Sequence, residues 1–258
     1  MKKLTLLFLF SMLMAPFSSA TLAEGLKVGT LFDNSGALKD WGPRHQNAAE
    51  LAAQQMAAAG FTIEFFHEDS QTAAEAAQKA ARKLIATDKV AVIIGSSSSG
   101  VIVPVAEAVT SPKNMLLISP GATSPYITDL PQDKDKDLLF RTCPSDTLQG
   151  VVLGKLAASL YKTASVVYVN NPYGQGLARH FQRSFVRHGG FVYTMIPHGE
   201  EVAPSYVEPL RNAFGRMFAT KPYRSGQSDV LCVISYPEHA KVFVKEAIEV
   251  YKCKHFLF

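Results

Sequence analysis

From residue 26 onward, short apolar segments with a strand-like pattern alternate with segments whose apolar residues recur at helical spacing. In the first half of the chain the strand-like segments are residues 26–32, 61–66, 90–95 and 115–119. The helix-like segments between them are residues 43–59, residues 72–87 and a segment that begins near Val101. Because parallel strands need crossover helices, this alternation predicts an α/β fold with mainly parallel sheets that helices cover on both faces.

Two of these helical segments indicate the face that meets the sheet. In residues 43–59 the apolar positions that share one face are Ala48, Leu51, Ala52, Met56 and Ala59. In residues 72–87 they are Ala77, Ala80, Ala81 and Leu84. Small side chains at this spacing predict helices that lie close to the sheet.

The pattern is interrupted once and then restarts. Residues 128–137 read as a solvated loop and residues 138–142 as an extended connector. Further helices are predicted at 147–161, 176–188, 206–219 and 238–251, and further strands at 165–169, 191–196, 230–235 and 255–258. The helix at 147–161 places Leu153, Leu156, Ala157 and Leu160 on one face. We therefore expect two similar lobes, residues 24–141 and residues 142–258, divided near Arg141.

The N-terminus shows the pattern of a secretory signal peptide. Lys2 and Lys3 precede an apolar stretch at residues 4–17, and small residues follow, among them Ala20 and Ala23. The stretch is too short and wrongly flanked for a membrane anchor, and we place the cleavage near Ala23. The mature chain is thus expected in a bacterial periplasm.

Composition and charge narrow the class of protein. With 47% hydrophobic and 19% charged residues, the chain is neither disordered nor a disulfide scaffold. Loss of the two leader lysines lowers the net charge of +4 to about +2, which predicts no nucleic-acid partner. The cysteines are Cys143, Cys232 and Cys253. Cys232 and Cys253 could form a bridge, or all three could be free, small buried residues.

Sequence motifs of enzymes are absent. The chain contains no HExxH, GxSxG or GxxxxGK[ST], and no zinc-like cysteine spacing. Gly174 and Gly176 begin a dinucleotide fingerprint, but Arg179 stands where its third small residue belongs. His67, Glu68 and Asp69 are adjacent on a strand, so their side chains do not converge on a metal. We predict a protein that is not an enzyme and that uses no metal or cofactor.

Two polar loops follow neighbouring buried strands. One is Gly95–Gly100, with four consecutive serines that include Ser98 and Ser99, and the other runs from Ser119 through Gly121 to Thr123. Loops at the carboxyl ends of parallel strands are the usual place for ligands in open α/β sheets. Their hydroxyl and backbone N–H groups suit the carboxylate of a small zwitterion, and a carbonyl with Thr123 suits its ammonium.

These loops also carry a family resemblance. The motifs IGSSSSG and ISPGATSP within Val90–Pro125 resemble the periplasmic binding proteins for leucine, isoleucine and valine in ABC transport. The similarity continues through FRTCPSD at 140–146, NNPYGQGLAR at 170–179 and SYPEHAKVF at 235–243. It implies the type I periplasmic-binding-protein fold, in which two lobes close on a small molecule and then dock on a membrane permease.

The resemblance also implies roles for particular residues. Ser99 matches the serine that holds the ligand carboxylate, and Gly121 and Thr123 match positions that bind its carboxylate and ammonium. Tyr173 and Tyr236 match contacts from the far lobe, and Trp41 falls where the family has an aromatic residue in the first loop. With Ser98 and Ser119 of the two polar loops, these residues form the expected ligand-binding set.

Three departures from the family accompany this resemblance. The cysteine pair of leucine-binding members is missing from the first lobe, and the family's acidic residue for the ligand ammonium would come after the last strand of this chain. The family chain also continues beyond the equivalent of Phe258 and crosses back to the first lobe. The resemblance therefore implies an incomplete second lobe.

The sequence supports one main function and two alternatives. The main prediction is the substrate-binding component of an ABC transporter, a monomer that binds an amino acid or a similar small carboxylate or amide. One alternative is a sensor protein of the same fold that presents its ligand to a receptor. The other, from a different class, is a periplasmic serine hydrolase that uses a serine of the 96–99 cluster.

Overall fold

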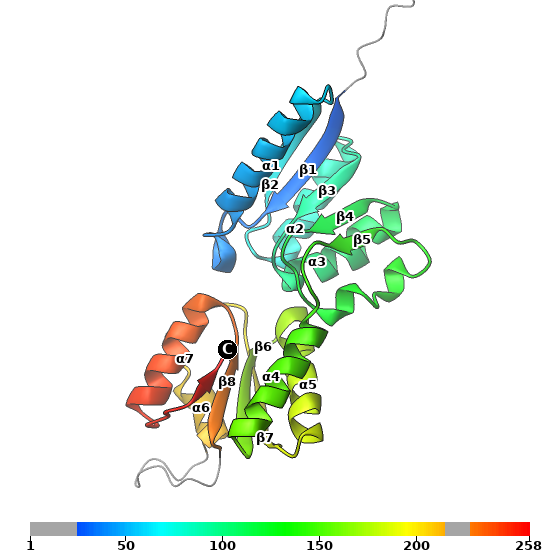
Figure 1. Ribbon diagram of the computed structural model, residues 1–258. Helices are drawn as coiled ribbons and strands as arrows, with labels where there is room; N and C mark the ends of the chain where they lie inside the picture. The colour runs from blue at the N-terminus through cyan, green and yellow to red at the C-terminus, as the bar shows by residue number, and fades with distance from the viewer. Residues whose placement is uncertain (1–24, 215–227) are drawn as a thin grey trace, which may run out of the picture.

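The protein folds into two lobes, each built on a parallel sheet (Figure 1). The computed structural model describes residues 25–214 and residues 228–258. The predicted signal peptide, residues 1–23, and the end of the helix predicted at 206–219 lie outside the described residues. Within the described ranges, the first sheet has five strands and the second has four, all paired in parallel. The predicted α/β fold class is thereby confirmed.

The first sheet has the strand order β2-β1-β3-β4-β5. Its strands are β1 (Leu26–Phe32), β2 (Ile63–Asp69), β3 (Val92–Gly95), β4 (Leu116–Ser119) and β5 (Leu139–Arg141). The segment expected to be an extended connector is β5, which pairs with β4 in register Ile118 to Phe140. Sequence reasoning missed this strand because three residues are too few to show a period.

Helices cover both faces of the first sheet. They are α1 (Gly42–Ala58), α2 (Ala74–Ala86) and α3 (Ser99–Val105). The apolar face predicted for α2 is buried as expected, in one core with Leu31, Ile93 and Leu117 of the strands. Short helical turns complete this lobe at η1 (Gly36–Leu38), η2 (Ala106–Thr110), η3 (Ser111–Lys113), η4 (Pro125–Ile127) and η5 (Pro131–Asp133).

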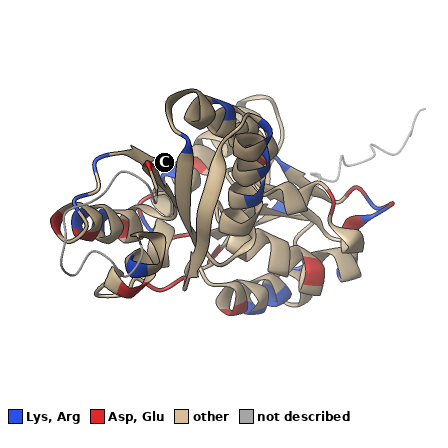
Figure 2. Ribbon diagram, turned by 90° about the horizontal axis from the view of Figure 1, so that it is seen from below, with Lys and Arg blue, Asp and Glu red and all other residues tan. Residues whose placement is uncertain are grey.

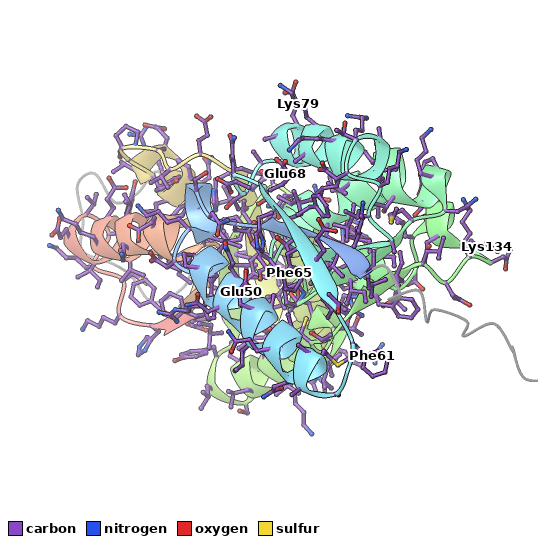
Figure 3. All side chains as sticks on the ribbon, turned by 90° about the horizontal axis from the view of Figure 1, so that it is seen from above. Glu50, Phe61, Phe65, Glu68, Lys79 and Lys134 are labelled. Atoms are coloured by element: carbon purple, nitrogen blue, oxygen red, sulfur yellow. The ribbon has the colours of Figure 1, made fainter. Side chains whose placement is uncertain are left out.

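The predicted core face of α1 is wrong. Leu51 and Met56 are exposed by 55% and 40%, and the three alanines grouped with them are exposed as well. The half-buried positions are instead His45, Ala49 and Ala53, which are spaced by four residues. Figure 3 shows Glu50 of α1 and Phe65 of β2 where helix and strand meet, whereas Lys79 projects outward from α2. A count of apolar residues could not identify the face that the sheet covers.

The second sheet has the order β7-β6-β8-β9. Its strands are β6 (Thr163–Val169), β7 (Phe191–His198), β8 (Val230–Ile234) and β9 (Phe256–Leu257). Successive residues of β6 face opposite helical layers, since Val166 packs with the α4–α5 side and Val167 with the α6–α7 side. This explains the continuous apolar runs of β6 and β8, because both faces of the sheet are covered.

The helices of the second lobe lie in two pairs (Figure 1). They are α4 (Asp146–Leu160), α5 (Pro172–Arg187), α6 (Val207–Phe214) and α7 (Pro237–Glu249). Helix α4 packs on α5 through Gly150 and Gly154, where an added Cβ would lie 2.6 Å from the Cβ atoms of His180 and Ser184. The face predicted for α4 is therefore wrong in part, because Leu156 and Leu160 are 51% and 62% exposed.

Charge is spread over both lobes. Figure 2 shows segments of both signs along the helices, with the central strands free of colour. Among the described residues, no helix has both the length and the apolar character needed to cross a bilayer. Cys143, Cys232 and Cys253 are all free thiols, of which Cys232 and Cys253 are buried.

Candidate functional site

A cavity of about 350 Å³ lies between the two lobes. Its walls come from loops at the carboxyl ends of strands in both sheets. The lining residues of the first lobe are Leu38, Trp41, His45, Ser97, Ser99, Pro120, Gly121 and Thr123. Those of the second lobe are Tyr173, Ser235, Tyr236 and Pro237. A cavity of this size fits a small organic molecule and combines aromatic surface with hydroxyl groups.

Asp33 organises the floor of the cavity. Its side chain is fully buried at the end of β1, and its Oδ1 accepts hydrogen bonds from Ser70 Oγ and Ser96 Oγ at 2.5 Å each. Its Oδ2 accepts the N–H of Ser97 at 2.8 Å. One buried carboxylate thus ties the ends of three neighbouring strands together, which holds the serine loop in place. The sequence analysis missed this role, although an acidic residue directly after a buried strand could have indicated it.

Ser119 joins the two polar loops of the first lobe. Its hydroxyl donates to the carbonyl of Ser96 at 2.7 Å and accepts the N–H of Ala122 at 2.9 Å. Its side chain is fully buried and does not line the cavity. Beside it, Gly121 passes so close to Ser97 that a Cβ would lie 2.8 Å from Ser97 Oγ. The loop can approach the serine cluster only because this position lacks a side chain.

Thr123 and Asp146 form a reciprocal pair. Thr123 Oγ1 donates to Asp146 Oδ2 at 2.8 Å, and the N–H of Asp146 donates to the carbonyl of Thr123 at 2.9 Å. Asp146 is 1% exposed, and its Oδ1 has no hydrogen-bond partner among the described residues. Burial raises the pKa of this carboxyl to about 6, against the opposing effects of Thr123 and the guanidinium of Arg141. Asp146 was not predicted as a site residue.

Two tyrosines form the wall of the second lobe. The rings of Tyr173 and Tyr236 are stacked, with centroids 5.9 Å apart and planes inclined by 16°. Tyr236 Oη lies 2.9 Å from Ser98 Oγ, and it accepts a hydrogen bond from Asn171 Nδ2 at 3.1 Å. Burial raises the pKa of Tyr236 to about 12, so its hydroxyl stays protonated. Ser98 therefore contributes a contact between the lobes and does not line the cavity.

Trp41 and His45 close the first-lobe side. Their rings are stacked at 6.2 Å, and the guanidinium of Arg44 lies 5.3 Å from the Trp41 ring. Trp41 is 48% exposed, so one face of the indole is open to a ligand or to solvent. Desolvation lowers the pKa of His45, while the charge of Asp33 acts in the opposite direction. His45 is therefore neutral at pH 7.

The structure brings most of the predicted site residues together. Among the eight, the cavity is lined by Ser99, Gly121, Thr123, Tyr173, Tyr236 and Trp41, whereas Ser98 and Ser119 lie behind its wall. Sequence reasoning did not single out His45, Ser97 or Ser235 as lining residues. Ser235 Oγ is buried and has no partner among the described residues, so it can offer a hydrogen bond to a ligand.

The geometry bears on nucleophilic chemistry as well. Ser97 Oγ lies 3.4 Å from His45 Nδ1, which is longer than the about 2.6–3.2 Å of a nucleophile and its base. In the described part of the chain, no carboxylate bonds to the other ring nitrogen of His45. A serine nucleophile would lack an oriented base here, whereas a ligand would meet an ordered set of hydroxyl groups and rings.

Comparison with known proteins identifies the family. The family model described as periplasmic binding protein matches residues 25–213. The chain belongs to the periplasmic binding protein family. This membership agrees with the resemblance that the serine-loop and SPGATSP motifs carry.

Two curated members of the periplasmic binding protein family illustrate its closest chemistry. An amino acid binding protein of Pseudomonas aeruginosa is 29% identical over 167 residues, which are 62% of this chain and 43% of that protein. A leucine-, isoleucine-, valine-, threonine- and alanine-binding protein of the same organism is 28% identical over 67% of this chain and 47% of its own length. This chain therefore spans about half the length of the curated relatives that it matches.

Solved structures of other binding proteins share the fold. The branched-chain amino acid transporter substrate binding protein of Streptococcus pneumoniae, in complex with isoleucine, matches with a TM-score of 0.69 at 23% identity. A solute binding protein of an ABC transporter from Rhodopseudomonas palustris, in complex with 3,4-dihydroxybenzoic acid, has a TM-score of 0.69 at 20% identity. The alignments cover 90% of this chain and 63% and 61% of those proteins.

Proposed function

We propose that this chain is the solute-binding component of an ABC transporter and that it binds an amino acid or a similar small carboxylate or amide between its lobes. The observation that carries the proposal is the cavity itself, which joins hydroxyl groups of one lobe to two stacked tyrosines of the other. The named ligands of the related proteins, which are amino acids and aromatic carboxylates, support the same class.

The ligand would be held mainly by the first lobe. Its carboxylate would lie against the hydroxyl of Ser99 and the backbone of Gly121, and its ammonium against Thr123 Oγ1. Charge-assisted hydrogen bonds of this kind contribute about 1.5–3 kcal/mol each. The rings of Trp41 and Tyr173 would cover the apolar part of the ligand. Micromolar affinity, about 8 kcal/mol, is within reach of these contacts after ordering costs.

Transport would follow from closure of the lobes. A ligand that touches both walls of the cavity favours the closed form, because only there can it make all of its contacts. The closed form would then dock on a membrane permease. In this proposal the chain carries a leader that is removed near Ala23, acts in the periplasm as a monomer, and needs no metal or cofactor.

Isothermal titration calorimetry with the purified chain tests this function. The panel contains aliphatic and aromatic amino acids, their amides, and small carboxylates including benzoate. We expect micromolar binding of one chemical group of the panel, and about tenfold weaker binding by Trp41→Ala, because one aromatic wall is lost. Phe140→Ala is the matched control, since Phe140 is equally exposed, at 47%, but lies outside the cavity. Absence of binding across the panel, or equal losses in both variants, would contradict the proposal.

A separate measurement addresses the hydrolase alternative. A fluorophosphonate reagent labels an activated serine, and we expect no labelling of residues 96–99, because Ser97 lacks an oriented base. Labelling that Ser97→Ala abolishes would favour the hydrolase instead. A receptor kinase gene beside this one, in place of permease and ATPase genes, would favour the sensor alternative.

A further inference from the structure

The buried carboxylate of Asp146 lies directly behind the ligand cavity. It occupies the first turn of α4, it is 1% exposed, and one of its oxygens has no partner in the described part of the chain. Its other oxygen accepts the proton of Thr123 Oγ1, which does line the cavity. Asp146 also lies near Tyr173, because its charge is one of the causes that raise the pKa of that phenol. A carboxylate that is buried and half-satisfied is costly unless something compensates for it.

We propose that Asp146 is a positioning residue that sets the hydrogen-bond direction of Thr123, so that the cavity accepts an ammonium group when Asp146 is ionised and loses this preference when Asp146 is protonated. This inference rests on the proposed function, and it names the regulation and the ligand class of the same site. Asp146 itself need not touch the ligand.

The argument begins with the proton inventory of a hydroxyl. Thr123 Oγ1 has one proton, and an ionised carboxylate can only accept, so the proton is committed to Asp146 Oδ2. The side of Thr123 Oγ1 that faces the cavity is then an acceptor. An ammonium N–H matches this acceptor, whereas a carboxylate oxygen of a ligand would meet lone pairs and be repelled.

The charge of Asp146 acts in the same direction. Among the cavity-lining residues there is no Asp, Glu, Lys or Arg, so the nearest described charge behind Thr123 is that of Asp146. A ligand cation at Thr123 would compensate the buried anion, and electrostatic attraction is strong where water is excluded. An amino acid is therefore favoured over its des-amino carboxylic acid by the same residue twice, through hydrogen-bond direction and through charge.

Protonation of Asp146 would reverse both effects. A neutral carboxyl can donate to Thr123, which frees the threonine proton for an acceptor on the ligand. The groups that face Asp146 are Thr123 from the loop after β4, Arg141 from β5, Cys143 from the connector and Tyr173 from α5. Arg141 is the charged group of this set, and it favours the ionised form. Because the pKa of Asp146 is about 6, binding of an amino acid should weaken as the pH falls through that value.

Calorimetry at two pH values on the purified chain and on Asp146→Asn tests the inference. Each amino acid that binds is paired with its des-amino acid, as L-isoleucine with 3-methylpentanoate. Asparagine keeps the shape and an acceptor for Thr123 but removes the charge and the titration. At about pH 7.5 we expect Asp146→Asn to bind the amino acid about tenfold more weakly, which corresponds to one pKa unit of coupling, and the des-amino acid as well or better. Lowering the pH to about 5.5 should weaken amino acid binding by the unsubstituted chain about threefold and leave Asp146→Asn nearly unchanged.

The matched control is Asp133→Asn. Asp133 also accepts backbone N–H groups, those of Leu138 and Leu139, but it lies far from the cavity in the loop after β4. It should leave the affinities and their pH dependence unchanged. His45 titrates in the same cavity, and any pH dependence that remains in Asp146→Asn reports on it.

The outcomes separate the two levels of the argument. If the unsubstituted chain binds an amino acid and Asp146→Asn binds it equally well, or weakens both members of the pair alike, the role of Asp146 is refuted and the proposed function stands. If only des-amino carboxylates bind to the unsubstituted chain, the inference is refuted while the function as a carboxylate binder stands. If nothing in the panel binds, the proposed function fails and the inference falls with it.

Discussion

Two buried titratable side chains, Asp146 and His198, are held in their neutral forms by desolvation, with opposite consequences for stability. Burial raises the pKa of Asp146 to about 6 and lowers that of His198 to about 4. His198 lies in an aromatic cluster, with its ring 4.8 Å from His239 and 5.0 Å from Phe243, and its Nε2 has no partner among the described residues. The folded state therefore takes up a proton at Asp146 more readily, and at His198 less readily, than the unfolded chain does.

These shifts predict opposite pH slopes of the unfolding free energy. The contribution of His198 is complete above pH 6.5 and is lost as the pH falls toward 4, whereas that of Asp146 grows as the pH falls from 6 to 3.8. His198→Asn, which keeps a donor for the carbonyl of Gly199, should lose less stability between about pH 7 and pH 4.5, by about 1–3 kcal/mol. Asp146→Asn should lose more over the same interval. Urea unfolding followed by circular dichroism measures both.

The exposed histidine His188 supplies the control for this experiment. His188→Asn should leave the pH slope unchanged, because an exposed side chain has nearly the same surroundings in both states. Equal slopes for the three variants and the unsubstituted chain would show that burial of Asp146 and His198 does not govern acid stability.

At the scale of the element, helices α1 and α4 show how packing selects a buried face. Both carry more apolar residues than their contacts use, so the apolar count alone points to the wrong side. In α4 the buried positions are Gly150, Gly154 and Ala157, because α5 approaches so closely that no larger side chain fits. Leu156, which helical periodicity predicts to be buried, is 51% exposed. Close approach of two helices is thus bought by small residues rather than by large apolar ones.

This packing predicts an inverted pair of substitutions. Gly154→Ala adds a methyl group 2.6 Å from Ser184 Cβ and 2.7 Å from the backbone nitrogen of Phe185, so we expect a loss of about 1–3 kcal/mol despite alanine's higher helix propensity. Leu156→Ala removes a large apolar side chain two positions away and should change stability by less than about 0.5 kcal/mol. Chemical denaturation of both variants gives the comparison. A greater loss for Leu156→Ala would mean that α4 is buried on its leucine face in solution.

At the scale of the whole molecule, a short chain of hydroxyl and amide groups joins the lobes beside the cavity. Ser98 of the first lobe bonds to Tyr236 of the second, whose hydroxyl also accepts from Asn171. A second link runs from Ser124 Oγ to the carbonyl of Pro172 at 2.8 Å. These contacts exist only while the lobes are together, so they contribute to the free-energy difference between closed and open forms.

Ser98→Ala tests this contribution without changing the cavity wall. Tyr236 keeps its bond with Asn171, while one hydrogen bond between the lobes is lost, worth about 0.5–1.5 kcal/mol. We expect a larger radius of gyration for the ligand-free protein in small-angle X-ray scattering, and ligand affinity lower by about two- to tenfold. Ser184→Ala is the control, because its buried hydroxyl donates to Val151 within the second lobe. An unchanged radius and affinity in Ser98→Ala would show that this bond does not influence closure.

The local pattern of the chain was enough to predict the strand and helix succession, the division into lobes and much of the cavity. Val166 and Val167 illustrate why, since a strand covered on both faces must be apolar at every position. Ser99, Gly121 and Thr123 were recognisable because polar and glycine residues directly after buried strands have few purely structural explanations. Parallel strands then bring such loops to one edge of the sheet, whatever the details of packing.

Other features depended on contacts between distant residues, and only the tertiary structure decided them. Strand β5 is a strand because β4 offers it a partner, and the buried face of α4 is set by α5. Asp146 looks like an ordinary first-turn acid in the sequence, yet the loop after β4 and helix α5 enclose it beside Thr123. Periodicity reports which residues share a face, but burial and pKa depend on what covers that face. The sequence by itself therefore determined the family and the position of the site, and the fold determined which side chains set its charge.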